Sequence, residues 1–290
     1  MLLNKKISIL YFIRQIKFQI LYIVLFATAI GFVDMHPWLK GITVPIGIPA
    51  LLGTAVSLLL AFRTSQSYER WWEARIIWGA IVNDSRTLVR LSLQFLSKEE
   101  AGQIALRQVI WVYSLSESLR RQPFSGFVVG YLEREGIKAT NIPNALLDKH
   151  SEQIKAATGK GQVSDFGQIQ LNEIITRLCD SMGRCERIKN TVFPRSYSVL
   201  LHTLIYVFAA MLPFGLDDEQ LVVEIILTIL IPIIFLSIEK TAIIMQDPFE
   251  NSPADTPMTK LCQTIETNLT EMCGIGKVTD TVETAGYYQM

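Results

Sequence analysis

The stretch VPIGIPALLGTAVSLLLAF, Val44 to Phe62, decides the fold of this chain. Its interior, from Gly47 to Phe62, contains no ionisable residue. At about 1.5 Å of rise per residue, a helix of this length nearly crosses the hydrocarbon core of a bilayer. Glycine, proline, threonine and serine interrupt the apolar run, although a helix that faced only lipid would not need them. The stretch therefore predicts a membrane-spanning helix that packs against other helices.

Two neighbouring stripes follow this helix at a spacing of about one turn. The first stripe consists of small residues, which let another helix approach closely: Gly53, Ser57 and Ala61. The second stripe lies beside it: Thr54, Leu58 and Phe62. If several copies packed side by side, the second stripe would face a shared axis and narrow it with apolar side chains. Hydrophobic gates in channels work through constrictions of this kind.

The composition predicts a protein that is divided between membrane and water. Of the 290 residues, 50% are hydrophobic and 19% are charged, and the mean hydropathy is +0.30. These values are too apolar for an ordinary soluble domain and too charged for a chain that lies wholly in a membrane. Lys plus Arg and Asp plus Glu balance at 27 each, so no basic excess supports nucleic-acid binding.

Three further segments are apolar enough to span a membrane: Phe18 to Val33, Tyr197 to Gly215, and Leu221 to Ile238. Basic residues cluster before the first span, after the second and before the third, in that order: Lys5, Lys6, Arg14 and Lys17; Arg63, Arg70 and Arg75; Lys189 and Arg195. The positive-inside rule then predicts four spans with both termini in the cytoplasm. A cleaved signal peptide is the alternative for the N-terminus, but no small-residue cleavage site follows Ile30.

The remaining segments read as helices that continue outside the membrane. A long helix is expected to run on from the second span to Leu96, and shorter helical patterns follow it: 99–122, 128–135, 143–157 and 164–189. No alternating β pattern persists, so the fold class is all-α. Two points stay open. Residues 4–17 form either a helix along the inner leaflet or an extension of the first span, and Trp71 and Trp78 lie either at the membrane interface or in a helical core.

The expected domains are an N-terminal part with spans one and two (1–62), a cytosolic helical domain (63–195), spans three and four (196–240) and a cytosolic tail (241–290). The four cysteines fall in segments placed inside the cell, where thiols stay reduced, and their spacing fits no zinc module.

The sequence contains no motif that is typical of a catalytic site. The three histidines, His36, His150 and His202, belong to separate segments, so neither a metal triad nor a histidine relay is predicted. The loop at 158–161 lacks the upstream glycine and the hydroxyl residue of a Walker motif. We therefore expect no enzyme activity and no cofactor or metal. His202 lies inside the third span, where an ionisable residue suggests function, although a packing role is the commoner explanation.

Several motifs in order resemble the bestrophin family, specifically its bacterial members. They are LLGTAVSLLLAF followed by RWW, NDSRTLVR at 83–90, CERIKNTVFPRSY at 185–197, DPF at 247–249 and LCQTIETNL at 261–269. The resemblance covers most of the chain. It implies a homopentameric ion channel in the bacterial inner membrane, in which the second spans line a narrow neck above a helical cytosolic vestibule.

The resemblance assigns the neck to Thr54, Leu58 and Phe62, the stripe already found from helical spacing. Thr54 departs from the apolar residue that is usual there, which predicts a wetter outer end of the neck. A second constriction at the cytosolic exit is assigned to Phe166, with Ile169 as the neighbouring candidate.

Animal bestrophins follow DPF with consecutive acidic residues that bind calcium. Here the segment reads DPFENSPADTP, in which Asp247, Glu250 and Asp255 are separated by prolines and polar residues. A calcium site needs several oxygen ligands that converge on the ion. The sequence therefore predicts a calcium-independent channel.

Ion selectivity follows from the resemblance alone, and it favours a monovalent cation such as sodium over an anion such as chloride. Two other function classes remain open. A secondary transporter would more often show internal repeats and paired broken helices. A membrane-anchored oligomeric scaffold would use its spans only as an anchor for the cytosolic helices.

Overall fold

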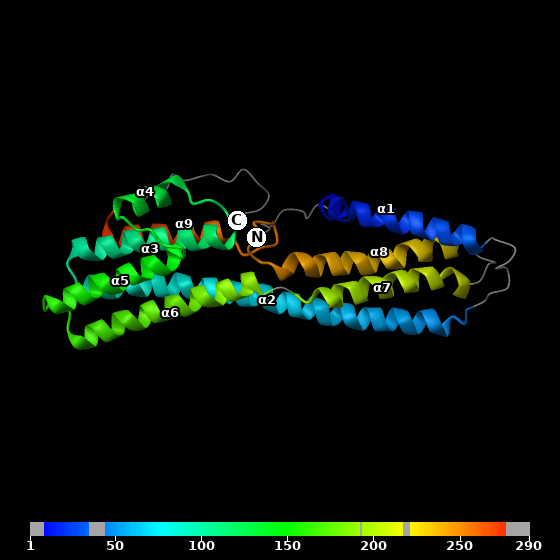
Figure 1. The fold of residues 1–290 in the computed structure, drawn as a ribbon, viewed down its shortest axis with the longest axis horizontal. Coiled ribbons are helices and arrows are strands. Elements are labelled where there is room, and N and C mark those ends of the chain that lie inside the picture. Colours follow the sequence, from blue (N-terminus) through cyan, green and yellow to red (C-terminus); the bar gives the residue numbers. More distant parts are fainter. Residues whose placement is uncertain (1–8, 35–43, 192, 217–220, 277–290) are drawn as a thin grey trace. The chain divides into compact units, whose positions relative to one another are not determined.

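The computed structural model describes residues 9–34, 44–191, 193–216 and 221–276, and all regular elements in these ranges are helical. The chain divides into two units (Figure 1). The described residues of 9–69 and 193–246 form one, which we call the apolar unit. The described residues 70–191 and 247–276 form the other, which we call the packed unit. The all-α prediction is confirmed for the part of the chain that is described.

The apolar unit contains the four predicted spans as helices. They are α1 (Ile9–Asp34), the first part of α2 (Gly47–Phe95), α7 (Arg195–Met211) with the short η1 (Pro213–Gly215), and α8 (Leu221–Gln246). Helix α1 is continuous from Ile9, so residues 9–17 extend the first span, and residues 1–8 lie outside the described chain. Helix α8 runs beyond the predicted end at Ile238 and contains Pro232 within its length.

A small core holds the apolar unit together. Helix α1 packs against α8, and α7 packs against both. The buried apolar side chains of this core come from all four helices: Ile23, Val56, Leu60, Leu201, Ile205 and Leu236. Gly215 lies close to Pro49 in the first turn of α2. A Cβ added at Gly215 would lie 3.1 Å from the proline ring. Larger residues at Gly215 would therefore push this turn away from the start of α2.

Two helices are long and apolar enough to cross a membrane on the described residues alone. They are α2 and the Ile225–Gln246 part of α8. The count reaches three if α7 is joined to the helix before it, and Ile16–Ile30 of α1 is apolar but shorter. Four spans therefore remain a prediction, although all four segments are helical in the structure.

The packed unit contains the second part of α2 and the helices α3 (Lys98–Leu119), α4 (Gly126–Arg134), α5 (Ile142–Gly159), α6 (Asp165–Asn190) and α9 (Met258–Cys273). Local sequence signals start three of them. Ser97 caps α3 in a capping box with Glu100, Asn141 caps α5, and Ser164 caps α6. Each cap accepts a backbone N–H that the first turn of a helix leaves unpaired.

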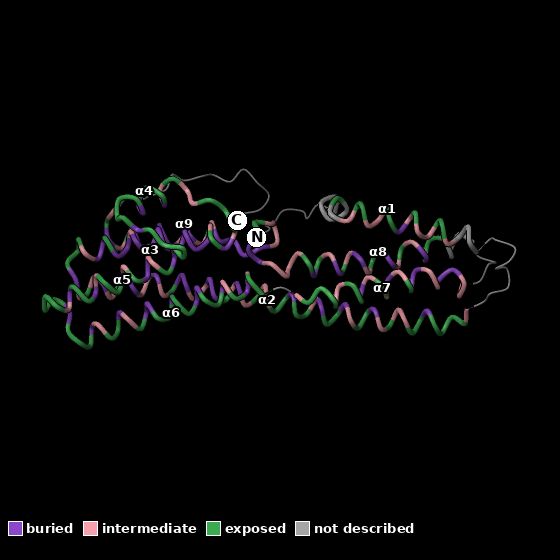
Figure 2. Tube along the Cα trace, viewed as in Figure 1, coloured by how far each residue is buried: buried purple, intermediate pink, exposed green. Residues whose placement is uncertain are grey.

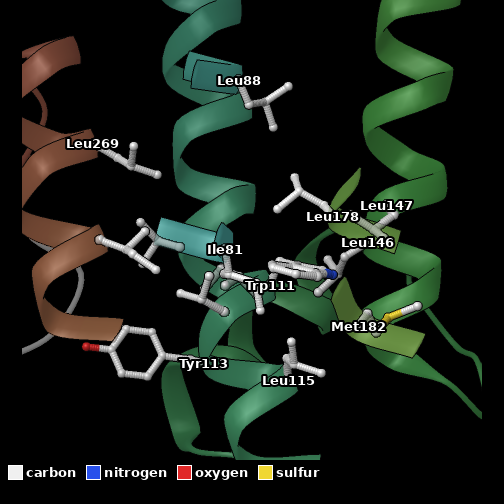
Figure 3. Packing of buried hydrophobic residues seen from close by; sticks show 14 of the residues in the cluster. Ile81, Leu88, Trp111, Tyr113, Leu115, Leu146, Leu147, Leu178, Met182 and Leu269 are labelled. Carbon is white, nitrogen blue, oxygen red and sulfur yellow. The ribbon is translucent and has the colours of Figure 1, made fainter. Parts of the chain in front are cut away.

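One large core joins these helices. Helix α3 lies at its centre and packs against α4, α5, α6 and α9. Trp78 of α2 and Trp111 of α3 are fully buried, and Figure 3 shows Trp111 among apolar side chains that include Ile81, Leu146 and Met182. In Figure 2, the purple of buried residues recurs along α3 and α9. Of the two positions that the sequence left open for Trp78, the membrane interface and a helical core, the structure shows the helical core.

The other tryptophan, Trp71, is half-buried, and its indole N–H donates to the carbonyl of Ala254 at 2.7 Å. This bond ties α2 to the segment that follows α8 within the packed unit. The C-terminal helix α9 completes the same core, because Cys262, Ile265 and Leu269 are fully buried against it. The motif LCQTIETNL at 261–269 lies within α9 and belongs to the packed unit.

Candidate functional site

The predicted neck stripe lies on the exposed face of α2. Leu58 and Phe62 keep 57% and 58% of their surface accessible, and Thr54 is also exposed. The opposite face of the same helix carries Val56 and Leu60, which are buried in the core of the apolar unit. Within one chain, large apolar side chains of a membrane helix therefore remain uncovered on one face. A lipid, another copy of the chain, or a water-filled path would have to meet them.

Thr54 occupies the outer position of this stripe. Its hydroxyl donates to the carbonyl of Ala50 at 2.8 Å, which is the usual bond of a threonine to the preceding turn of its helix. The hydroxyl proton is thereby used within the helix, and only the oxygen lone pairs remain to hydrate a passing ion. The wetter outer end that the sequence predicted would therefore depend on an acceptor oxygen.

The three residues of the small stripe have different surroundings. Gly53 faces α7 of its own chain, where an added Cβ would lie 3.1 Å from the ring of Phe208. Ser57 and Ala61 are exposed, and they line an open groove of about 510 Å³ between α2 and α8. The walls of the groove on α8 are Phe235, Ile238 and Met245. Gly53 thus supports packing within the chain, whereas the other two leave space for a neighbouring helix or lipid.

Directly after Phe62, a buried ion pair anchors α2 to the rest of the apolar unit. The Arg63 guanidinium donates to Glu239 Oε1 of α8 at 3.0 Å and to Ser198 Oγ of α7 at 2.8 Å. The side chains of Arg63 and Glu239 are 3% and 1% exposed. His202 Nε2 lies 2.7 Å from the other oxygen of Glu239, and the guanidinium stacks 4.8 Å above the Phe193 ring. The last neck residue is therefore adjacent to a rigid attachment point.

Sequence reasoning did not find this attachment. Arg63 was assigned to the basic cluster that follows the second span, and Glu239 was not singled out. The signal was present, because Glu239 follows the uncharged run IIFLSI of span four and a lone acid at that depth needs a partner. The packing role preferred for His202 agrees with its contact to this carboxylate.

The two candidates for the cytosolic constriction lie on the first turns of α6 in the packed unit. Phe166 is 80% exposed and Ile169 is 64% exposed, which are high values for large apolar residues beside a closed core. The backbone here is held by Ser164, whose hydroxyl accepts from the Gly167 N–H at 3.2 Å. Both side chains point away from the core of their own unit, and they belong to a different unit from the neck residues.

The carboxylates of the segment after α8 contact a lysine and a serine of the same chain. Lys189 Nζ of α6 lies 2.6 Å from Asp247 Oδ2 and 3.8 Å from Glu250 Oε1. Asp255 accepts from the backbone N–H of Ser252 at 2.9 Å and from its hydroxyl at 2.5 Å. Burial raises the pKa of the Asp255 carboxyl, and burial together with the nearby Asp247 raises that of Glu250. These acids therefore face an ammonium and a serine as their nearest partners.

The described residues contain no group of three or more His, Cys, Asp or Glu side chains arranged to hold a metal ion. The four cysteines are present as free thiols, with Cys179 exposed and the others buried. Burial raises the pKa of the Cys185 thiol to about 12, which keeps it protonated and unreactive.

Comparisons with known proteins agree with the motifs. The family model described as Bacterial/Fungal Bestrophin protein matches residues 7–271. The voltage-dependent anion channel-forming protein YneE of Escherichia coli is 30% identical over 285 residues, which cover 96% of this chain and 93% of that protein. A voltage-dependent anion channel-forming protein of Ralstonia nicotianae is 29% identical over 234 residues, with 78% and 76% covered.

The fold also matches a solved structure. The crystal structure of a bacterial bestrophin homolog from Klebsiella pneumoniae aligns with a TM-score of 0.82 at 28% sequence identity. The match covers 90% of this chain and 99% of that one. Similarity in sequence and in fold therefore extends over nearly the whole length of both chains.

Proposed function

The chain belongs to the bacterial and fungal bestrophin family, and we propose that it forms a homopentameric ion channel of the inner membrane. The observation that carries this proposal is the exposed apolar stripe of Thr54, Leu58 and Phe62 on a helix whose other face is buried. One such helix encloses no path, whereas a ring of copies does. In that ring, Leu58 and Phe62 would make two stacked apolar constrictions.

The proposed topology has four spans and both termini in the cytoplasm, with the packed unit as a cytosolic vestibule. The basic clusters beside the spans support this orientation. Phe166 and Ile169 are the proposed residues of a second constriction at the exit of the vestibule. Their large exposed fractions leave both side chains available for that position.

The conducted ions are proposed to be small and monovalent. The leaning toward sodium rested on family resemblance alone, whereas the relatives that match most of this chain are named anion channel-forming proteins. We therefore propose an anion such as chloride as the main permeant ion. Reversal potentials of the purified protein in asymmetric sodium chloride distinguish the two ions directly.

Opening is proposed to be independent of calcium. The support comes from the segment after α8, where Lys189 contacts Asp247 and Glu250 and where Ser252 occupies both oxygens of Asp255. Channel currents in liposomes should remain unchanged when a chelator removes calcium from both sides. A strict requirement for micromolar calcium would contradict this part of the proposal.

The neck is tested with the Leu58→Ala, Phe62→Ala double variant. Smaller side chains should widen and wet the constriction, so conductance or open probability should rise while ion preference changes little. Gly53→Ala is not a suitable control, because it alters packing on Phe208. The matched control is Leu200→Ala, which truncates an exposed leucine of α7 in the same unit.

The alternatives predict different results for the same pair of measurements. If the stripe packs against lipid or other spans, the double variant should lose stability, by about 2–5 kcal/mol for each buried large-to-Ala change, without a gain in current. A membrane-anchored scaffold would pass no current at all. A secondary transporter would show solute flux without single-channel steps.

A further inference from the structure

The exposed stripe of α2 does not end at Phe62. At about 100° per residue, the next positions on the same face are Ser65 and Glu69. Glu69 lies within about 20° of the mean direction of the three neck residues and about 10 Å beyond Phe62 along the helix axis. Helix α2 is uninterrupted through these positions, and Glu69 is exposed. The stripe therefore leads from three side chains without charge to a carboxylate.

No cation is paired with Glu69 among the described residues. The hydroxyl of Ser65 lies 3.5 Å from Glu69 Oε1. The nearest basic residue along the helix toward the neck, Arg63, is on the opposite face and is bound to Glu239. The basic residue that follows, Arg70, directs its guanidinium to the carbonyls of Thr191 and Ile188. Along α2 from Phe62, Glu69 is therefore the first acidic or basic side chain that faces the same direction as the neck.

We infer that Glu69 sets the charge discrimination at the inner mouth of the neck, by enriching cations there and opposing the entry of anions. The inference rests on the proposed pentamer, in which the carboxylates of the copies form a ring around the axis. Such a ring concentrates counter-ions and repels ions of its own sign. The Debye length is about 8 Å at physiological salt, which is shorter than the ~10 Å rise to Phe62, so the field of the ring acts on ions at the inner mouth more than on ions inside the neck.

This placement matters because the neck itself has no means to choose by charge. The segment Gly47 to Phe62 contains no ionisable residue, and its apolar rings act through width and wetness. A charged side chain near one mouth of the neck would supply such a choice. For a channel that passes chloride, Glu69 restrains chloride entering from the cytoplasm more than chloride entering from outside, so the current should depend on direction.

The test compares the purified wild-type channel with Glu69→Gln and Glu69→Lys in planar bilayers under asymmetric sodium chloride. Neutralising the ring should raise the chloride-to-sodium permeability ratio by about threefold or more at ~0.1 M salt, and the lysine should raise it further. The difference between the variants should shrink at ~1 M salt, where the Debye length is about 3 Å. The matched control is Glu133→Gln, an exposed acid on α4 that changes the net charge by the same amount.

The outcomes separate this inference from the proposed function. A wild-type protein that carries no current overturns both. A conducting wild-type whose permeability ratio is the same in Glu69→Gln, or shifts equally in Glu133→Gln, overturns only the role of Glu69. Size-exclusion chromatography with light scattering gives the assembly state of each variant. Loss of the oligomer in Glu69→Gln would show that the carboxylate is a structural partner between copies, and would also overturn the inference.

Discussion

The two units of this chain bury their large side chains to different degrees. In the packed unit, Trp78 and Trp111 are fully enclosed by helices of the same chain. In the apolar unit, the core is small, and only 28% of the candidate span in α2 is buried. Leu58 and Phe62 are as uncovered as residues of a protein surface, although they are strongly apolar.

The difference indicates what each unit needs from its surroundings. Burial of apolar surface in water stabilises the packed unit without a partner, because each helix covers the apolar face of another. The apolar unit has no such need for a large core in lipid, where helices associate through close packing and polar contacts. The buried ion pair of Arg63 with Glu239 is such a polar contact. The stability of the packed unit therefore depends on close packing of its buried side chains. The stability of the apolar unit depends on a few specific polar contacts.

The largest expected effect is the loss of the packed core in Trp111→Ala. Removal of a fully buried indole from the centre of α3 should lower the free energy of unfolding by about 4 kcal/mol. Thermal unfolding of the detergent-solubilised protein measures the change. Phe166→Ala is the matched control, because it truncates an exposed aromatic of the same unit. Similar losses in the two variants would contradict the difference in burial.

The second-largest loss of stability is expected in the apolar unit, for Glu239→Ala. This change leaves the Arg63 guanidinium buried without its counter-charge, which should cost about 3 kcal/mol. The double variant Arg63→Met, Glu239→Leu removes both charges and should recover most of the stability, because the cost arises from the charge that is left alone. Unfolding temperatures of the three proteins report the result. A double variant no more stable than Glu239→Ala would show that shape at this site matters more than charge.

The smallest effect on stability is expected at Phe166, a large apolar residue of the packed unit that is exposed. Phe166→Ala should change the free energy of unfolding by no more than about 0.5 kcal/mol, because its side chain is 80% exposed. If Phe166 lines the exit, the same change should alter relative ion permeability, measured from reversal potentials in the assembled channel. Unchanged permeability ratios with an intact oligomer would exclude Phe166 and leave Ile169 as the candidate.

Sequence patterns predicted the helices well, because each helix carries its own local signals. The predicted helices at 143–157 and 164–189 correspond to α5 and α6, whose starts are set by the caps Asn141 and Ser164. The neck stripe followed from spacing along one helix, which needs no knowledge of other elements. By contrast, Lys189 was placed only in a basic cluster before the third span, although it contacts Asp247 of a distant segment. A pairing over 58 residues leaves no periodic trace in the sequence.

The sequence by itself determined the all-helical class, the position of the apolar segments and the face of α2 that carries Thr54, Leu58 and Phe62. These features depend on hydrophobicity and on the period of the helix, which are local properties. Only the tertiary structure decided that this face stays uncovered, that Arg63 anchors the helix through Glu239 directly beside it, and that Glu69 has no cation partner among the described residues. Those outcomes depend on which distant side chains meet, and hydrogen bonds and ion pairs form only where the fold brings their partners within about 3 Å.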